Sequence, residues 1–491
     1  MDKPAVERVD DIGASPGDIN GSDSGHSKIA RRLLLKQDLS IVLILSGCYF
    51  FAYLDRGALG NARIMEFQKD LHLDNSQFYN CLLMFFVGYM VAELPAALLL
   101  RILPSNLVYA LSCLGFGLLA ACTSKAGGYA GVMVIRFLLG IMEAAIQTGF
   151  VFISLWYQEK EMATRSAFFY ISAPIAGAAS GLISYGVQKN LNGANGLYSW
   201  QWLFIIEGVF SVAWGILTFI VMPRLPEVVA RKGSWLFRDE ASRELILRRT
   251  TQRNAPDAKP CLWQIGWALK DIKTWLGALI IGAASMNIAA FGVFLPTFLH
   301  EFGWSPLQTQ LYSIIPYACA VVSLPVLTMS SGRVQQKAAF LFGCLSTCVV
   351  GYIILLCTTK RAACLFACCL VAIGSYPGVV LGASFLLLNQ AGYTKRATAW
   401  AVTQIFIQCY SIIATQVYTS PPRYLKGHGV LVGLNFVAVV AIAIKSILMK
   451  RSNAQRDAAD QRFQEEGTAD PEMVKSLEEL CDYHPSFRYV L

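Results

Sequence analysis

The chain has 491 residues, of which 55% are hydrophobic and only 15% are charged, and its mean hydropathy is +0.48. A composition this apolar excludes a soluble globular protein and indicates an all-α protein of the lipid bilayer. The net charge of +9 does not indicate a nucleic-acid partner, because the lysines and arginines stand beside apolar segments and form no single basic patch interleaved with aromatic residues.

The chain opens with a polar segment. Residues 1–38 are rich in Asp, Gly and Ser and lack the early apolar core of a secretory signal peptide, so we expect a retained and disordered tail. After this tail the sequence predicts twelve transmembrane helices, six on either side of a polar insert. The expected spans are residues 39–60, 78–100, 103–122, 128–156, 165–187, 201–222, 274–299, 307–329, 336–358, 362–388, 397–419 and 429–449.

This pattern predicts two six-helix bundles. The first would cover residues 39–222 and the second residues 274–450, with a linker at 223–273 between them and a tail at 451–491. The linker carries eleven Lys or Arg, whereas all the connections on the opposite side together carry eight. Positive charge is retained on the inner side of membranes, so both termini and the linker are expected in the cytoplasm.

Charged residues appear at the end of the first span and inside the second. Asp55 and Arg56 are adjacent, so their side chains point about 100° apart, and at least one of them must face the bundle interior or a cavity. The alternative is a pair lying at the membrane interface. Glu93 is an isolated carboxylate in the second span.

The fourth span carries two charges, Arg136 and Glu143, in an apolar stretch of almost thirty residues. Each charge costs at least roughly 2.5–3.5 kcal/mol inside a bilayer, so both need partners, water or a ligand. A spacing of seven residues is close to two helical turns, and the two side chains therefore lie on one face. The alternative to a functional site is an Arg–Glu bridge that serves helix packing.

Small residues follow one line of the fifth span, at Ala173, Gly177 and Gly181, where another helix can approach closely. The spans of the second half are nearly uncharged but carry amides at Asn287, Gln404 and Gln408. We treat these three amides as candidate substrate-binding residues.

The two halves are related by an offset of 231 residues, which indicates a parallel repeat. The offset takes Asp74 to Ser305, each a candidate helix N-cap. It also takes Arg56 to Asn287, so the interior charges are expected in the first half alone.

Several segments resemble a known family, namely YLDRGALGNARI, RFLLGIMEA, SLWYQEKEMATR, WLFIIEG, NQAGYTKRATA and PPRYLKGHG. They are similar to fungal major facilitator carriers of the anion:cation symporter group, which includes allantoate and nicotinate permeases. The resemblance implies a plasma-membrane carrier that moves an organic anion with protons by alternating access. It implies that Arg56 and Arg136 bind the anion and that Glu143 takes part in proton coupling, with Asp55 and Glu93 as the next candidates.

The sequence also departs from that family. Ala58 stands where the family usually has Asn, and Ala145 and Thr148 stand where it usually has Gly and Pro. These positions lie in or beside the proposed binding helices, so the substrate of the family members is not transferred to this chain.

The leading hypothesis is H⁺-coupled uptake of a small organic anion, a monocarboxylate, vitamin or nitrogenous acid, by a monomeric carrier. The alternatives are an efflux carrier for a drug or metabolite and a nutrient receptor that does not transport. An enzyme is not expected, because no nucleophile–base spacing and no glycine-rich phosphate loop is visible. The five histidines are scattered, and we expect no metal and no cofactor.

Overall fold

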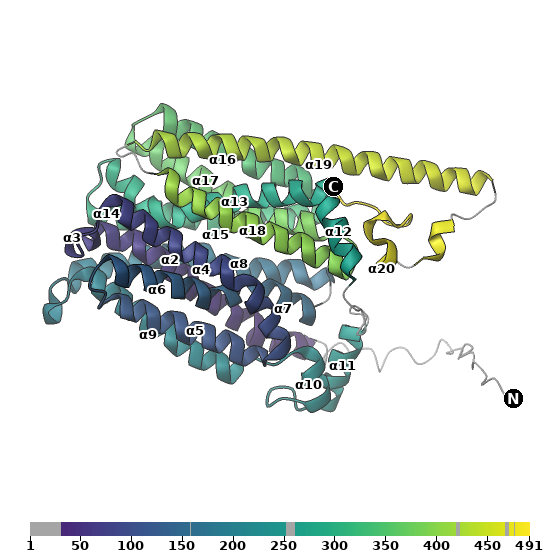
Figure 1. The fold of residues 1–491 in the computed structure, drawn as a ribbon, viewed down its shortest axis with the longest axis horizontal. Helices are drawn as coiled ribbons and strands as arrows, with labels where there is room; N and C mark the ends of the chain where they lie inside the picture. The colour runs from purple at the N-terminus through teal and green to yellow at the C-terminus, as the bar shows by residue number, and fades with distance from the viewer. Residues whose placement is uncertain (1–30, 158, 252–260, 419–422, 467–470, 476) are drawn as a thin grey trace.

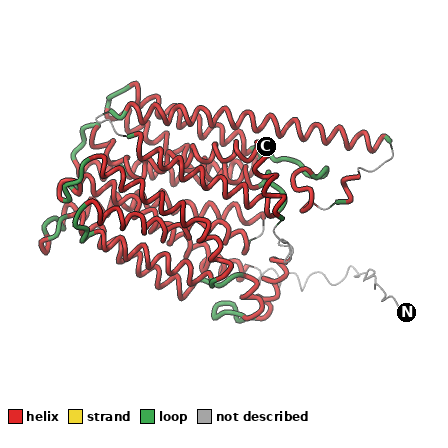
Figure 2. The backbone as a smooth tube through the Cα atoms, viewed as in Figure 1, coloured by secondary structure: helices red, strands yellow, loops and turns green. Residues whose placement is uncertain are grey.

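The fold is helical throughout the part of the chain that the computed structural model describes, residues 31–157, 159–251, 261–418, 423–466, 471–475 and 477–491. No strand occurs among these residues, and short loops join the helices (Figure 2). The predicted all-α membrane fold is therefore confirmed. The expectation of disorder for residues 1–30 lies outside the described residues.

Each half of the chain contributes six long helical units. The first half contains η1 (Asp38–Val42), α2 (Leu43–Ile64), α3 (Phe67–Asp70), α4 (Asn75–Ile102), α5 (Ser105–Thr123), α6 (Tyr129–Glu143), η2 (Ala144–Thr148), α7 (Gly149–Trp156), α8 (Glu159–Asn190), η3 (Ala194–Gly196) and α9 (Ser199–Val221). The linker contains α10 (Pro226–Lys232), α11 (Glu240–Thr251) and α12 (Leu262–Lys270). The second half contains α13 (Ile272–Glu301), α14 (Pro306–Tyr312), α15 (Ile314–Val334), α16 (Lys337–Cys357), α17 (Arg361–Leu387), α18 (Tyr393–Val417), α19 (Leu425–Glu465), η4 (Pro471–Val474), α20 (Leu477–Leu480) and η5 (Cys481–Tyr483).

Eleven helices of the described chain are long and apolar enough to cross a membrane. They match eleven of the predicted spans, and the remaining span, 78–100, lies on α4, a helix of 28 residues. The first helix already begins at Arg31, and α19 continues to Glu465, so both extend past the predicted spans. Hydropathy marks only the part of a helix that lies within the bilayer. The polar extensions of these two helices were therefore not predicted.

The repeat of 231 residues is visible in the helix caps. The Asp74 side chain accepts a hydrogen bond from the Gln77 backbone, and the Gln77 side chain accepts one from the Asp74 backbone, which forms a capping box at the start of α4. Ser305 and Gln308 form the same box at the start of α14, and Pro306 takes the first helical position. Both predicted caps are confirmed.

The two bundles lie side by side, α2 to α9 in the lower part of Figure 1 and α13 to α19 in the upper part. Between the bundles, α2 contacts α13, α4 contacts α18, and α8 contacts α14 and α15. The linker helices and the C-terminus lie at the right-hand end of Figure 1, which we call the linker end. We call the opposite end, where α3 and α14 lie, the far end.

Glycines let the two bundles meet closely toward the far end. Gly60 of α2 lies against the Val293 carbonyl of α13, and a Cβ atom on Gly60 would overlap that oxygen. On α8, a Cβ atom at Gly181 would lie 2.8 Å from the Gln310 carbonyl oxygen. Gly177 faces the ring of Tyr317 in the same way, so the close approach predicted along the fifth span is confirmed.

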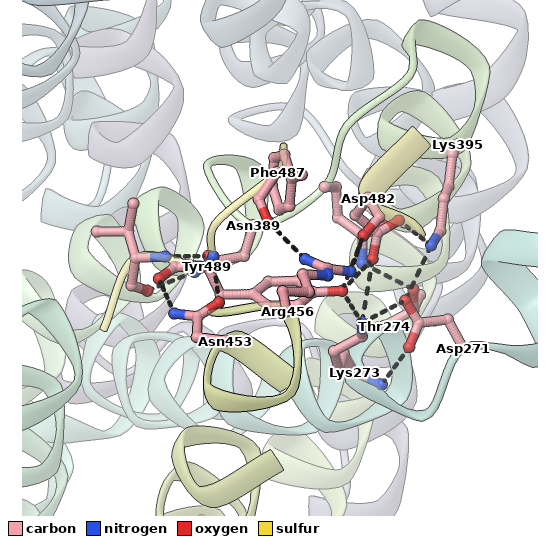
Figure 3. A network of polar contacts seen from close by, with 12 residues as sticks. Asp271, Lys273, Thr274, Asn389, Lys395, Asn453, Arg456, Asp482, Phe487 and Tyr489 are labelled. Atoms are coloured by element: carbon pink, nitrogen blue, oxygen red, sulfur yellow. Dashed lines mark hydrogen bonds and ion pairs between the residues drawn. The ribbon is translucent and has the colours of Figure 1, made fainter. Parts of the chain in front are cut away.

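The end of the chain folds back onto the linker end of the second bundle (Figure 3). The buried carboxylate of Asp482 accepts hydrogen bonds from Lys395 on α18 and from Lys273 on α13. Asp271 accepts a further bond from Lys395 at 3.1 Å, so two lysines and two aspartates balance in charge. We call residues 481–491, which bring Asp482 to this site, the tail segment.

Main-chain contacts extend this docking along the tail segment. The Asn389 amide donates to the Val490 carbonyl at 2.9 Å, and its oxygen accepts from the Val490 backbone at 2.7 Å. Asn453 of α19 makes the same two-way contact with Tyr489, at 2.9 Å in both directions. The tail segment therefore ties α13, α18 and α19 together at one end of the bundle.

Candidate functional site

Two buried ion pairs join α2 to α6. Arg56 donates from Nε to Glu143 Oε2 at 2.8 Å, and Arg136 donates from Nη1 to Asp55 Oδ2 at 3.4 Å. Each arginine therefore pairs with an acid on the other helix, so the bridge within α6 that the sequence left open as an alternative is replaced by pairs between helices. The side chains of Asp55 and Arg56 both reach charges of α6, Asp55 that of Arg136 and Arg56 that of Glu143.

Arg56 lies at the wall of a cavity between the two bundles. Its side chain is 20% exposed, whereas that of Glu143 is fully buried behind it. The guanidinium stacks near the rings of Tyr53 at 4.7 Å and Tyr89 at 5.1 Å. Such contacts restrict the orientation of the flat guanidinium at the cavity wall.

The cavity has a volume of about 70 Å³ and is lined by residues from both bundles. It is small compared with ligand sites of roughly 300–1,000 Å³. Among its described lining residues, Arg56 is the one charged side chain. The aromatic lining consists of Tyr49, Tyr53, Phe86, Tyr89, Phe150, Tyr170, Tyr317, Tyr376 and Trp400.

Arg136 lies deeper in the first bundle and is not part of the described cavity lining. Its side chain is 3% exposed, and its guanidinium lies 5.7 Å from the ring centre of Phe204 on α9. Within the described structure, its Nε and Nη2 atoms have no hydrogen-bond partner. The two arginines that the sequence grouped together thus occupy different environments.

The helix that carries Arg136 and Glu143 is interrupted, which the sequence did not predict. The expected single span 128–156 divides into α6, the 3₁₀ segment η2 and α7. In η2 the Thr148 hydroxyl donates to the Ala145 carbonyl at 2.5 Å and accepts from the Tyr109 hydroxyl at 2.9 Å. This local bond competes with the regular helix pattern, and the change of pitch directly follows Glu143.

Glu93 and the two glutamines of α18 connect the bundles. Gln404 donates to the Glu93 carboxylate at 2.7 Å, so a candidate proton-coupling acid of the first half meets a candidate binding amide of the second. Gln408, one turn further along α18, lines the cavity. Gln408 and Arg56 therefore line one cavity, from the second and the first bundle respectively.

Asn287 occupies a different place. It is fully buried and exchanges two hydrogen bonds of 2.9 Å with Asn435 of α19. It is absent from the described lining of the cavity. Its amide is thereby engaged in holding α13 against α19.

One buried carboxyl near the site was not selected from the sequence. Glu207 of α9 is 1% exposed and lies close enough to Asp55 and Arg136 for their charges to act on it. The signal was present, because Glu207 is an isolated acid in the apolar run WLFIIEG, as Glu93 is in its own span.

The described residues contain no group of three or more His, Cys, Asp or Glu side chains placed to hold a metal ion.

Relatives of this chain are fungal transporters. A high-affinity nicotinic acid transporter of Saccharomyces cerevisiae is 28% identical, with 99% of this chain and 89% of the relative covered. An MFS-type transporter of Penicillium expansum, cnsO, is 30% identical, with 95% and 92% covered. The resemblance to fungal major facilitator carriers is therefore confirmed.

Solved structures agree on the fold. A D-xylose–proton symporter superposes with a TM-score of 0.63 at 13% identity, covering 82% of this chain and 97% of the symporter. A bacterial homologue of the human lysosomal transporter Spinster, in an inward-facing form, gives a TM-score of 0.61 at 14% identity, with 82% and 95% covered. The family model of the major facilitator superfamily matches residues 45–415, and this chain belongs to that superfamily of multi-pass membrane transporters.

Proposed function

We propose that this transporter couples the uptake of a small aromatic carboxylate to H⁺ across the plasma membrane. The observation that carries the proposal is the Arg56–Glu143 pair at the cavity wall. A substrate carboxylate and Glu143 compete for the same guanidinium, because Arg56 is the charged group of the described lining. Protonation of Glu143 releases Arg56 for the substrate, so proton and anion bind cooperatively.

The aromatic lining supports a planar substrate. Tyrosine and tryptophan rings offer flat apolar faces with polar edges, which suit an aromatic ring that carries one charged group. The side chains of Gln147 and Gln408 line the same cavity and supply amides for a ring nitrogen or hydroxyl. The relative named for nicotinic acid transport points to the same class of compound.

The remaining parts of the proposal are topological. Both termini and the linker face the cytoplasm, which follows from the eleven Lys and Arg of the linker. The substrate then enters from the far end and leaves at the linker end, and the carrier works as a monomer.

The test uses purified carrier in vesicles and a panel of radiolabelled aromatic and aliphatic monocarboxylates, with nicotinate included. We expect an inward proton gradient to drive accumulation of at least one aromatic acid. The Glu143→Gln variant keeps Arg56 free and cannot release a proton, so it should exchange that acid at a near-normal rate without accumulating it. Normal gradient-driven accumulation by the variant would remove Glu143 from the coupling mechanism.

A further inference from the structure

Glu207 is a buried acid that the proposed mechanism does not use. It lies on α9, which packs against α2, α5 and α8. Neither of its carboxylate oxygens has a hydrogen bond among the described residues. The nearby Ser180 hydroxyl accepts a bond from Asn61 at 2.9 Å, and its own proton is the one neutral donor that the described residues offer Glu207 there. A buried carboxyl in this condition is costly to keep unless a charged or polar partner reaches it in some state of the protein.

Arg136, in contrast, has hydrogen-bond donors without acceptors. Its bond to Asp55 is long at 3.4 Å, and its Nε and Nη2 groups have no acceptor within the described chain. Its guanidinium lies over the ring of Phe204, which precedes Glu207 by three residues and so lies on the same face of α9. The unused donors of Arg136 therefore lie on the face of α9 that carries Glu207 and its unused acceptors.

The charges of this region do not balance in pairs. Asp55, Glu143 and Glu207 are three acids, and Arg56 and Arg136 are two cations. Helix α5, which also packs against α9, carries no charged residue between Ser105 and Thr123. With Arg56 engaged by Glu143, Asp55 and Glu207 share the single cation Arg136.

We propose that Glu207 is the second counter-ion of Arg136, and that the arginine moves from Asp55 to Glu207 when Asp55 loses its charge or is drawn away. Removing one partner of a buried pair leaves an uncompensated ion, and a second acceptor within reach avoids that penalty. Helix α2 can then separate from α6 at this level while Arg136 stays neutralised. The inference rests on the proposed function only for the timing of the exchange, since Asp55 is a candidate for proton coupling after Glu143.

The experiment is a double-mutant cycle on the full chain in detergent, followed by thermal unfolding. Asp55→Asn removes the first counter-ion and Glu207→Gln the second. We expect each single variant to lower the melting temperature moderately, and the double variant to lower it by more than the sum of the two shifts, because only the double variant leaves Arg136 unpaired. Additive shifts would overturn the proposal.

Two further variants keep the test decisive where the double variant does not fold. Adding Arg136→Gln to the double variant removes the orphaned charge, so the triple variant should regain folded, monodisperse protein. Glu207→Asp in the Asp55→Asn background keeps a carboxyl, and it should melt close to Asp55→Asn alone. A triple variant that stays unfolded, or an aspartate that behaves as glutamine does, would contradict the exchange.

A structure of the Asp55→Asn variant gives the direct readout. Arg136 should lie within hydrogen-bond distance of a Glu207 oxygen, and an arginine that stays beside the substituted side chain of α2 would refute the movement. These measurements need neither substrate nor a proton gradient. A failure of the proposed transport reaction therefore leaves their outcome interpretable.

Discussion

Arg56 and Arg136 differ in what each can reach. Arg56 is partly exposed at the cavity and presents a rigid fork that aromatic rings hold in place. Arg136 is enclosed between α2, α6 and α9 and meets no described part of the cavity lining. Arg56 is suited to contact a substrate anion. Arg136 is suited to neutralise the buried carboxylates between the surrounding helices.

This difference predicts different kinetics for the same substitution. Arg56→Lys replaces a planar fork by a point charge and loses a charge-assisted bond worth about 1.5–3 kcal/mol, so the apparent KM should rise roughly 10- to 150-fold. Arg136→Lys should lower the maximal rate more than it raises KM. Initial uptake rates of the best substrate of the carboxylate panel, measured over a range of concentrations, separate the two effects. Equal rises in KM for both variants would show that both arginines contact the anion.

At the scale of elements, glycine packing toward the far end decides how closely α2 approaches α13. Every other residue type places a Cβ atom on the helix surface, and only a glycine allows a neighbouring carbonyl to lie against its backbone. Gly60 meets the Val293 carbonyl in this way, whereas Gly186, on α8, has no atom within 4 Å of where its Cβ would stand. The same substitution at these two positions therefore tests the interface.

Gly60→Ala should weaken closure of the far end. Overpacking costs typically about 1–3 kcal/mol, which corresponds to a shift of roughly 5- to 150-fold away from the closed arrangement. A reporter thiol, introduced as Ser313→Cys beside Gly181, should react faster with an impermeant maleimide applied from the far end, and transport should slow. Gly186→Ala serves as the control and should resemble the parent. Unchanged labelling in Gly60→Ala would show that the interface tolerates the methyl group.

At the scale of the whole molecule, the tail segment closes the linker end of the second bundle. Asp482 is buried with Lys395 and Lys273, and it is the residue of the tail segment that balances their charge. Arg488 of the same segment instead pairs with the more exposed Asp457 and Asp460 of α19. The buried ion pairs of Asp482 and the more exposed ion pairs of Arg488 should therefore contribute differently to the free energy of unfolding.

Asp482→Asn should lower stability by about 3–5 kcal/mol, because it leaves a buried lysine uncompensated. Arg488→Ala should change stability by no more than about 1 kcal/mol. Thermal unfolding in lipid nanodiscs and limited proteolysis of the tail segment measure both. Equal behaviour of the two variants would mean that the tail segment is held by its backbone contacts alone.

The pH dependence of this docking follows from the same charges. Burial alone acts to raise the pKa of Asp482, but Lys395 and Lys273 outweigh it and hold the pKa below its ordinary value. Its contribution to stability is therefore complete above the ordinary aspartate pKa, about 3.9, and is lost as the pH falls through the lowered pKa. Protection of the tail segment from protease should accordingly stay constant between about pH 5 and pH 8.

The sequence by itself determined the membrane class, the spans, the repeat and the set of interior charges. A bilayer imposes a one-dimensional rule, since a span needs about 20 apolar residues and every charge within it needs a reason. The capping boxes at Asp74 and Ser305 could be predicted for a similar reason, because a cap involves residues only three apart.

Only the tertiary structure decided which charges meet. The rotation and tilt of each helix against its neighbours decide these contacts. They pair Arg56 with Glu143, place Asn287 away from the cavity and bring Glu207 near Arg136. Rotation and tilt are set by packing and not by the length of an apolar run. The docking of the tail segment has the same origin, because an irregular segment carries no period from which its partners could be read.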